Sequence, residues 1–294
     1  MERVSKMKIL LFGAMGQLGT ELQSTMSSLG EVAAYDMHNL DLERITEVLR
    51  TIRTLRPDVI VNASAYTAVD QAETEPEKAL YVNGEIPGIL AEEAVRLDAF
   101  LVHYSTDYVF DGSKGTSYVE TDVPNPLGVY GRSKLAGEEA IRAGKSHYLI
   151  LRTSWVYSRN RNSFVTKVLE WAYKQEEMHI VADQLSNPTW AYRLADVTAC
   201  LLGLELGTLR DRRGLYHVAG TGYTSRLDWA SKIIELDPNK HRQKVRVIQP
   251  ARTSDFPTPA QRPLFSALDC SLFRSTFGIR VPHWEDDLQL AMNS

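Results

Sequence analysis

The stretch Met7-Lys-Ile-Leu-Leu-Phe-Gly-Ala-Met-Gly-Gln-Leu-Gly19 decides the fold prediction, because it joins an apolar run to the glycines Gly13, Gly16 and Gly19. Glycine permits a tight turn and lets the backbone approach a pyrophosphate closely. A helix that begins within the stretch would direct free N–H groups at the phosphates. The stretch therefore predicts a strand, a phosphate-binding turn and a helix. Its G-x-x-G-x-x-G spacing differs from the familiar G-x-G-x-x-G, so a glycine-rich turn without a ligand is the alternative.

Four more short apolar runs follow in the first half of the chain: Val32–Tyr35, Asp58–Val61, Phe100–Tyr104 and Tyr148–Leu151. Segments with helical periodicity separate most of them, as at Leu42–Arg56 and Ala79–Leu97. Buried strands that alternate with helices are typical of βαβ units and a parallel sheet. The connections of such units are right-handed, which favours a Rossmann-type, doubly wound α/β sheet.

The second half of the chain is divided by prolines into shorter pieces. It predicts helices at Phe164–Lys174, Ala195–Leu204 and Leu227–Leu236, and a strand at Val245–Ile248. We expect residues 1–155 to form an NAD(P)-binding Rossmann domain, to which some later segments return. Residues 156–294 should form mainly a smaller C-terminal substrate-binding lobe.

Composition excludes several classes of protein. The 294 residues include 33 Lys and Arg against 37 Asp and Glu, a net charge of −4 that argues against a dedicated nucleic-acid binder. No apolar run is long enough to cross a membrane, and the first residues lack the apolar stretch of a signal peptide. The cysteines Cys200 and Cys270 provide no disulfide framework, and the histidines show no metal-ligand spacing. We therefore expect a cytoplasmic protein without a bound metal, a nucleic-acid partner or a membrane partner.

Distinctive residues follow each predicted strand: Gly13, Asp36, Ala63-Ser-Ala-Tyr66, Ser105-Thr-Asp107 and Thr153-Ser-Trp155. In an open parallel sheet, ligands bind beyond the carboxyl ends of the strands. These residues should therefore line one crevice.

Asp36 lies 17 residues after Gly19, near the offset at which an acid bonds the ribose 2′-OH of NAD. A carboxylate there would repel the 2′-phosphate of NADP. The alternative is an ordinary turn aspartate. His38 and the absence of a nearby arginine leave NADH and NADPH both open as the cofactor.

The segment Tyr130-Gly-Arg-Ser-Lys134 carries the strongest catalytic signal. Tyr130 and Lys134 are four residues apart and share one helix face. A phenol with a pKa of about 10 is a poor acid near neutrality, and a nearby ammonium lowers that pKa. The pair could then protonate a carbonyl oxygen as a hydride reaches its carbon. Lys134 could also hold the nicotinamide ribose, and the Thr106 hydroxyl could hold the substrate oxygen. A surface helix is the alternative.

Four motifs resemble the dTDP-4-dehydrorhamnose reductases of the extended short-chain dehydrogenase/reductase superfamily. They are Asn62-Ala-Ser-Ala-Tyr-Thr-Ala-Val-Asp70, His103-Tyr-Ser-Thr-Asp-Tyr-Val-Phe110, Tyr130-Gly-Arg-Ser-Lys-Leu-Ala-Gly-Glu138 and Arg152-Thr-Ser-Trp-Val-Tyr157. The similarity extends from about Met7 to Trp284 and includes Pro257-Thr-Pro-Ala-Gln-Arg-Pro263.

The resemblance implies that NADPH or NADH reduces the C4 ketone of a dTDP-linked 4-keto-6-deoxy sugar, dTDP-4-dehydro-β-L-rhamnose, to dTDP-β-L-rhamnose. It implies Tyr130 as proton donor, Lys134 as its partner, and Thr106, Asp107 and Trp155 as substrate contacts. The dinucleotide contacts that it implies are Gly16, Gln17, Leu18, Asp36, Asp41, Leu42, Ala65, Tyr66 and Thr67. Without the resemblance, Trp155 would be expected in the core.

Departures from the family pattern limit what is carried over. Ser158 and Ser163 replace a common Gly and Asn, so the loop after Trp155 is expected to differ. Tyr192 stands where some members carry a glutamate of a metal-assisted dimer, so we expect no metal and leave a homodimer open.

Two charged features near the expected site have alternative interpretations. Arg262 could pair with the substrate diphosphate or lie in an exposed loop. Glu73, Glu75 and Glu77 fit a solvated face near a helix start better than a metal site.

Two rival functions stay open from sequence. One is another nucleotide-sugar 4-ketoreductase or an epimerase-reductase on the same scaffold. The other is a binding module, because the regulatory subunit of methionine adenosyltransferase resembles the same family. Retention of Thr106, Tyr130 and Lys134 favours catalysis.

Overall fold

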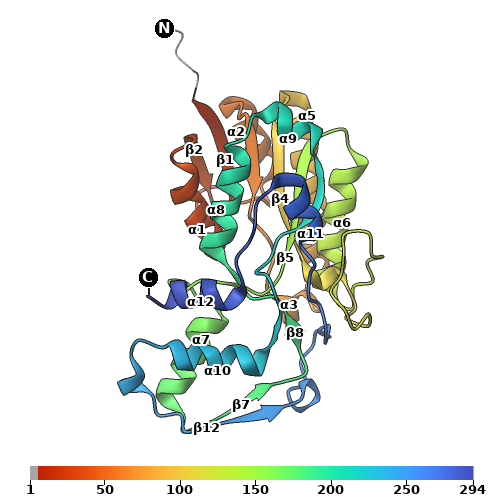
Figure 1. Cartoon of the computed structure of the whole chain (residues 1–294). Helices are drawn as coiled ribbons and strands as arrows, with labels where there is room; N and C mark the ends of the chain where they lie inside the picture. Colours follow the sequence, from red (N-terminus) through yellow and green to blue (C-terminus); the bar gives the residue numbers. More distant parts are fainter. Residues whose placement is uncertain (1–5, 294) are drawn as a thin grey trace.

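A computed structural model describes residues 6–293 of the chain (Figure 1). Its strands are β1 (Met7–Phe12), β2 (Gly30–Tyr35), β3 (Val59–Asn62), β4 (Phe100–Thr106), β5 (His147–Thr153), β6 (Val156–Tyr157), β7 (Glu177–Val181), β8 (Leu185–Ser186), β9 (Thr189–Trp190), β10 (Gly214–His217), β11 (Thr224–Ser225) and β12 (Val247–Ala251).

The α-helices are α1 (Gln17–Met26), α2 (Ile45–Leu55), α3 (Val69–Ala72), α4 (Pro76–Leu80), α5 (Ile86–Leu97), α6 (Val129–Ala143), α7 (Phe164–Lys174), α8 (Ala191–Leu202), α9 (Leu206–Asp211), α10 (Arg226–Leu236), α11 (Ser271–Phe277) and α12 (Trp284–Asn293). A π-helical turn, η1 (Tyr81–Glu85), joins α4 to α5. The 3₁₀ turns are η2 (Asp107–Val109), η3 (Lys240–Arg242) and η4 (Thr253–Asp255).

Six strands form one parallel sheet in the order β10-β5-β4-β3-β1-β2. The order reverses direction beside β1, which places the glycine turn after β1 at a topological switch point. This arrangement confirms the predicted Rossmann-type, doubly wound α/β sheet.

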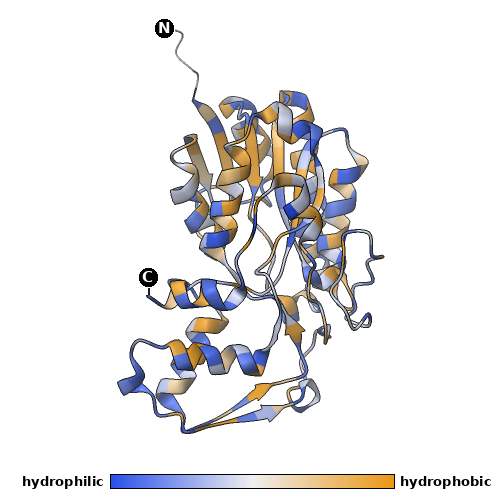
Figure 2. Cartoon of the chain, in the orientation of Figure 1, coloured by the Kyte–Doolittle hydropathy of each residue, from blue (hydrophilic) through white to orange (hydrophobic). Residues whose placement is uncertain are grey.

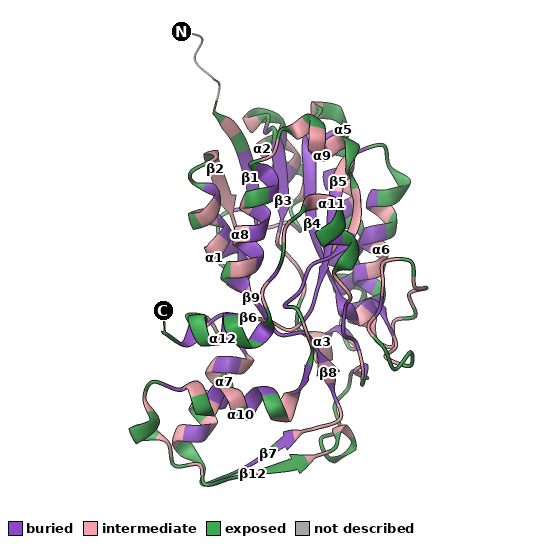
Figure 3. Ribbon diagram, in the orientation of Figure 1, coloured by how far each residue is buried: buried purple, intermediate pink, exposed green. Residues whose placement is uncertain are grey.

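Both faces of the sheet are buried. Along β1, Ile9 and Leu11 pack into a cluster with α1 and α8, whereas Leu10 and Phe12 pack into a second cluster with α2 and α5. Successive strand residues point to opposite faces, so a strand covered on both sides must be apolar throughout. Figure 2 shows the apolar strands at the centre, and Figure 3 shows the same strands as the most buried part of the molecule.

Four elements from the second half of the chain, α8, α9, β10 and α11, join this sheet layer. Helix α8 packs against α1, and β10 pairs with β5 at the edge of the sheet. The sequence analysis did not identify β10. The domain boundary after residue 155 stays a prediction, although these returning segments are of the kind that it anticipated.

Helices α7, α10 and α12 and strands β7 and β12 lie beyond the carboxyl ends of the large sheet (Figure 1). Helices α7, α10 and α12 share one apolar cluster centred on Trp229, and the two-stranded β7–β12 sheet lies at the far end. Between residues 6 and 293, no helix is long and apolar enough to cross a membrane.

Candidate active site

A cleft of about 670 Å³ runs along the carboxyl ends of the sheet strands. It brings together residues that follow five different strands. The predicted residues that line it are Gly13, Gly16, Gln17, Leu18, Asp36, Ala65, Thr67, Thr106, Asp107, Tyr130, Lys134 and Trp155.

The glycine turn has the conformation that its sequence requires. Gly13 has φ +86°, in the left-handed region that favours glycine, and a Cβ there would lie 2.6 Å from the Ala63 carbonyl carbon. A Cβ on Gly19 would lie 1.9 Å from the Gly13 oxygen, so this glycine lets α1 pack closely against the turn. No side chain caps the first turn of α1. Its free N–H groups therefore suit a phosphate.

Unpartnered polar atoms in the cleft fit a dinucleotide. The buried Oε1 of Gln17, Oγ of Ser105 and Oγ1 of Thr153 have no hydrogen-bond partner among the described residues. Such groups are costly unless a ligand or water satisfies them. Together with the glycine turn, they indicate that the cleft is built to receive a polar ligand such as NAD(P).

Asp36 lies directly after β2 and lines the cleft beside Met37 and His38. Its Oδ1 accepts a hydrogen bond from the His38 backbone N–H at 2.7 Å. The second carboxylate oxygen is the one available for a ribose hydroxyl.

Several predicted dinucleotide contacts lie outside the lining of this cleft. Gly19 packs against the turn, and Leu42 packs into the core beside α2. Asp41 accepts a hydrogen bond from the Glu43 backbone at 3.0 Å, and the Tyr66 hydroxyl donates to Glu75 at 3.0 Å. Their contacts with a dinucleotide stay predictions.

Tyr130 lies in the first turn of α6, where its ring makes an edge contact with Tyr108 at 5.7 Å between centroids. Burial raises the pKa of Tyr130 above its ordinary value, and a hydrogen bond with the Thr106 hydroxyl partly offsets that rise. The Thr106 oxygen also accepts the Tyr108 backbone N–H at 3.2 Å. The structure thus places Thr106 and Tyr130 together as the sequence predicted.

Lys134 differs from the expectation in its partners. Its Nζ donates to the Tyr104 carbonyl at 2.7 Å and lies 3.4 Å from Nε2 of His103, while Tyr130 is not among its hydrogen-bond partners in the described structure. Burial lowers the pKa of Lys134 to about 8. The ammonium therefore does not lower the pKa of the phenol directly, because it is held against β4, one helical turn after Tyr130.

Asp107 is buried, and three hydroxyl groups donate to its carboxylate. Ser266 donates to Oδ2 at 2.5 Å, Ser186 donates to the same oxygen at 3.1 Å, and Thr106 donates to Oδ1 at 3.2 Å. Burial raises the pKa of Asp107 to about 6, although these hydrogen bonds act in the opposite direction. Asp107 thereby orients Thr106, and its contact with a sugar stays a prediction.

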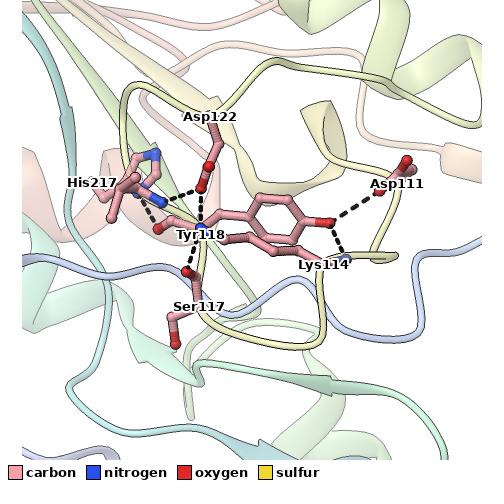
Figure 4. A network of polar contacts seen from close by, with 7 residues as sticks. Asp111, Lys114, Ser117, Tyr118, Asp122 and His217 are labelled. Carbon is pink, nitrogen blue, oxygen red and sulfur yellow. Dashed lines mark hydrogen bonds and ion pairs between the residues drawn. The ribbon is translucent and has the colours of Figure 1, made fainter.

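Contacts before α6 fix the position of Tyr130. The Glu73 carboxylate accepts the Val129 backbone N–H at 2.8 Å, so one member of the predicted solvated acidic face instead caps α6. Upstream, the Tyr118 hydroxyl donates to Asp111 at 3.0 Å, and the His217 ring bonds the Tyr118 carbonyl at 3.1 Å (Figure 4). The loop that leads into the helix is thus tied to β10.

Trp155 follows β5 with φ +39°, an uncommon conformation for a bulky residue and therefore a strained one. Its ring stacks on Trp229 with centroids 5.5 Å apart, and the Arg226 guanidinium lies 3.8 Å from its centroid. Trp155 lines the cleft and also packs against the apolar cluster around Trp229, so it joins the two parts of the molecule.

A second cavity of about 580 Å³ lies beyond Arg226. Its lining includes the cations Lys167, Arg226 and Arg262 and the aromatic residues Phe164, Trp171 and Phe256. Among the described residues that line it, none is acidic. This charge pattern suits an anion that carries an aromatic or apolar group.

Arg262 lies at this second cavity, not at the first. It donates to Asp70 of α3 at 2.7 Å, and the Ala260 backbone donates to the same carboxylate at 3.2 Å. The side chain is 21% exposed and is held by its ion pair with Asp70, so it is not a freely exposed loop arginine. Its contact with a diphosphate stays a prediction.

Two residues near the site were missed by the sequence analysis. Asn83 of η1 accepts the Tyr66 backbone N–H at 2.8 Å and donates to Ser133 Oγ at 3.0 Å, which links the loop after β3 to α6. An Asn-Gly pair inside an otherwise helical segment was the available signal. Arg226 begins α10 and belongs to no motif, so no sequence signal could have identified it.

Residues 6–293 contain no group of three or more His, Cys, Asp or Glu side chains arranged to hold a metal ion.

Comparisons with known proteins agree with this geometry. The family described as the RmlD substrate binding domain matches residues 7–294. A dTDP-4-dehydrorhamnose reductase of Escherichia coli (strain K12) is 40% identical, with 98% of this chain and 97% of the relative covered. The corresponding protein of Burkholderia thailandensis is 42% identical, with 95% of each chain covered. The crystal structure of a dTDP-4-dehydrorhamnose reductase from Bacillus anthracis in complex with NADP superposes with a TM-score of 0.89, at 33% identity over 98% of this chain and 99% of that chain.

Proposed function

The chain belongs to the dTDP-4-dehydrorhamnose reductase family, and from that premise we propose that it reduces the C4 ketone of dTDP-4-dehydro-β-L-rhamnose with NADPH or NADH to give dTDP-β-L-rhamnose. The meeting of Thr106, Tyr130 and Lys134 at the end of the glycine-lined cleft is the observation that carries the proposal. A regulatory subunit would not need this set of residues.

The glycine turn and the start of α1 would hold the pyrophosphate, and Asp36 would hold the adenosine ribose. Lys134 would hold the nicotinamide ribose. When bound, the reduced nicotinamide supplies a hydride for the C4 carbon.

Tyr130 would give its hydroxyl proton to the ketone oxygen as C4 is reduced. The Thr106 hydroxyl donates to Asp107 and accepts the Tyr108 backbone N–H in this structure, and it would turn its single proton from Asp107 to that ketone oxygen when the sugar binds. Burial keeps the pKa of Tyr130 above its usual value, so the phenol carries its proton at neutral pH before the reaction begins.

The second cavity would receive the dTDP group. Arg226 and Arg262 offer planar donors suited to phosphate oxygens, and Lys167 adds a third cation. Trp155 would then lie between the nucleotide and the reacting sugar. This arrangement accounts for a substrate that carries its sugar on a nucleoside diphosphate.

A coupled absorbance assay tests the proposal. The protein is mixed with NADPH or NADH and a dTDP-4-keto-6-deoxy sugar, with and without the 3,5-epimerase that forms dTDP-4-dehydro-β-L-rhamnose. We expect loss of the reduced-nicotinamide band only when the epimerase is present. Oxidation without the epimerase would identify a different 4-ketoreductase, and no oxidation with any sugar would favour a regulatory module. We also propose a cytoplasmic location and a homodimer, which need separate measurements.

A further inference from the structure

A chain of buried hydrogen bonds leads from the loop after β3 to the ammonium of Lys134. The Ser64 backbone N–H donates to Asn62 Oδ1 at 3.2 Å, and the Ser64 hydroxyl donates to the same oxygen at 2.5 Å. The Asn62 amide nitrogen lies 3.1 Å from Nδ1 of His103. On its other side, His103 Nε2 lies 3.4 Å from Lys134 Nζ.

The orientation of Asn62 is fixed, because a backbone N–H can only donate. Asn62 Oδ1 must therefore face Ser64, and Asn62 Nδ2 must donate to His103. His103 Nδ1 is then an acceptor and carries no proton. Both side chains are buried at 1% exposure, so no solvent competes with this arrangement.

His103 is neutral in this position. Its complete burial, and secondarily the charge of Lys134, hold the pKa of His103 well below its usual range. A neutral imidazole with a bare Nδ1 carries its proton on Nε2. The group that faces Lys134 is therefore an N–H donor, which cannot accept a hydrogen bond from the ammonium but can donate to the lone pair of the neutral amine.

We propose that His103, held in the Nε2–H tautomer by Asn62 and Ser64, is a positioning residue that weakens the affinity of Lys134 for its proton. The other groups around Lys134 are the Tyr104 carbonyl from β4, Tyr130 and Glu138 from α6, and Arg152 from β5, which pairs with Glu138 at 2.6 Å. Burial is the largest cause of the lowered pKa of Lys134, and the charge of the Glu138 carboxylate opposes it. Because Arg152 pairs with that carboxylate, we expect the oriented N–H of His103 to add to the effect of burial.

Only the catalytic consequence of this inference rests on the proposed function. A lysine that releases its proton near neutral pH can restore a proton to the active site after Tyr130 has given one away. The tautomer and the lysine titration belong to the protein alone and are measured without cofactor or sugar.

The first measurement determines the tautomer. The protein is labelled with ¹⁵N-histidine, and two-bond ¹H–¹⁵N correlations are recorded between about pH 6 and pH 9. The His103 signal is identified by its loss in His103→Leu. We expect Nε2 protonated and Nδ1 bare throughout. A proton on Nδ1, alone or with Nε2, overturns the proposal.

The second measurement is the titration of Lys134 by ¹³C NMR of its Cε. In His103→Leu, which keeps the site apolar and removes the N–H, we expect the Lys134 midpoint to rise by about one pH unit, the size of an ordinary hydrogen-bond contribution. His217→Leu, the same change at a buried histidine of β10, should leave the midpoint in place. An unchanged or lowered midpoint in His103→Leu overturns the proposal, because a histidine that only filled space would not oppose the charge.

Discussion

The guanidinium of Arg226 lies 3.8 Å from the ring centroid of Trp155, between the two cavities. The interaction free energy of a cation this close to an indole face is about 0.5–2 kcal/mol. The contact holds the strained Trp155 backbone in place and fixes the wall that separates the dinucleotide cleft from the proposed nucleotide-sugar cavity.

Trp155→Ala should therefore chiefly raise the KM for the sugar nucleotide, by about 3- to 30-fold, with a smaller change in kcat. Steady-state kinetics at saturating NADPH measures both constants. Trp190→Ala is the matched control, because Trp190 belongs to the same apolar cluster but lines neither cavity. An unaltered KM in Trp155→Ala would assign this tryptophan to core packing alone.

Tyr130→Phe should lower kcat by about 10²- to 10⁴-fold, since the phenol can no longer donate a proton to the ketone oxygen. Dinucleotide affinity, measured by fluorescence titration, should change little. Tyr173→Phe, at a hydroxyl that bonds Asp237 far from the cleft, serves as the control. Near-normal turnover of Tyr130→Phe would remove Tyr130 from the chemistry.

Asp36→Ala should weaken NADH binding more than NADPH binding. The variant loses a hydrogen bond to the ribose and also loses the charge that repels a 2′-phosphate. The ratio of the two Kd values is the readout, and Glu31→Ala on the same strand is the control. A ratio equal to that of the wild type would contradict the role of Asp36.

The rate should depend on pH at both ends. Because the pKa of Lys134 is lowered to about 8, its ammonium is lost as pH rises through that value, and kcat/KM should fall there. Because the pKa of Asp107 is raised to about 6, its carboxylate is protonated as pH falls through that value. Thr106 then loses its charged acceptor, and kcat/KM should fall there too. Asp107→Asn should remove the acidic limb and keep the basic one. A profile that is flat from pH 5 to 9 would contradict both assignments.

The sheet could be predicted from sequence because its strands are covered on both faces. The runs at β1, β3 and β4 are mostly apolar, so local pattern alone identified them, and α7 was predicted with its observed ends. The edge strand β10 was missed because Gly214–His217 is short and its pairing with β5 is decided by residues that lie more than sixty positions away.

The site could be predicted where its residues follow strands. It could be predicted less well where it depends on the direction and the hydrogen-bond partners of a side chain. Gly13 and Asp36 come directly after strands and Thr106 ends β4, so the topology alone brings them to one cleft. Spacing placed Tyr130 and Lys134 on one helix face, but it could not show that the Tyr104 carbonyl draws the ammonium away from the phenol. Arg226 and Asn83 act through contacts between distant segments, which no local pattern reports.

Transfer of deuterium from [4-²H]NADPH to the sugar tests the central claim most directly. The account predicts dTDP-rhamnose with deuterium at C4 from the wild-type protein, and the same labelled product from Tyr130→Phe at a rate lower by about 10²-fold or more. A product without deuterium at C4, or equal rates from the two proteins, would contradict it.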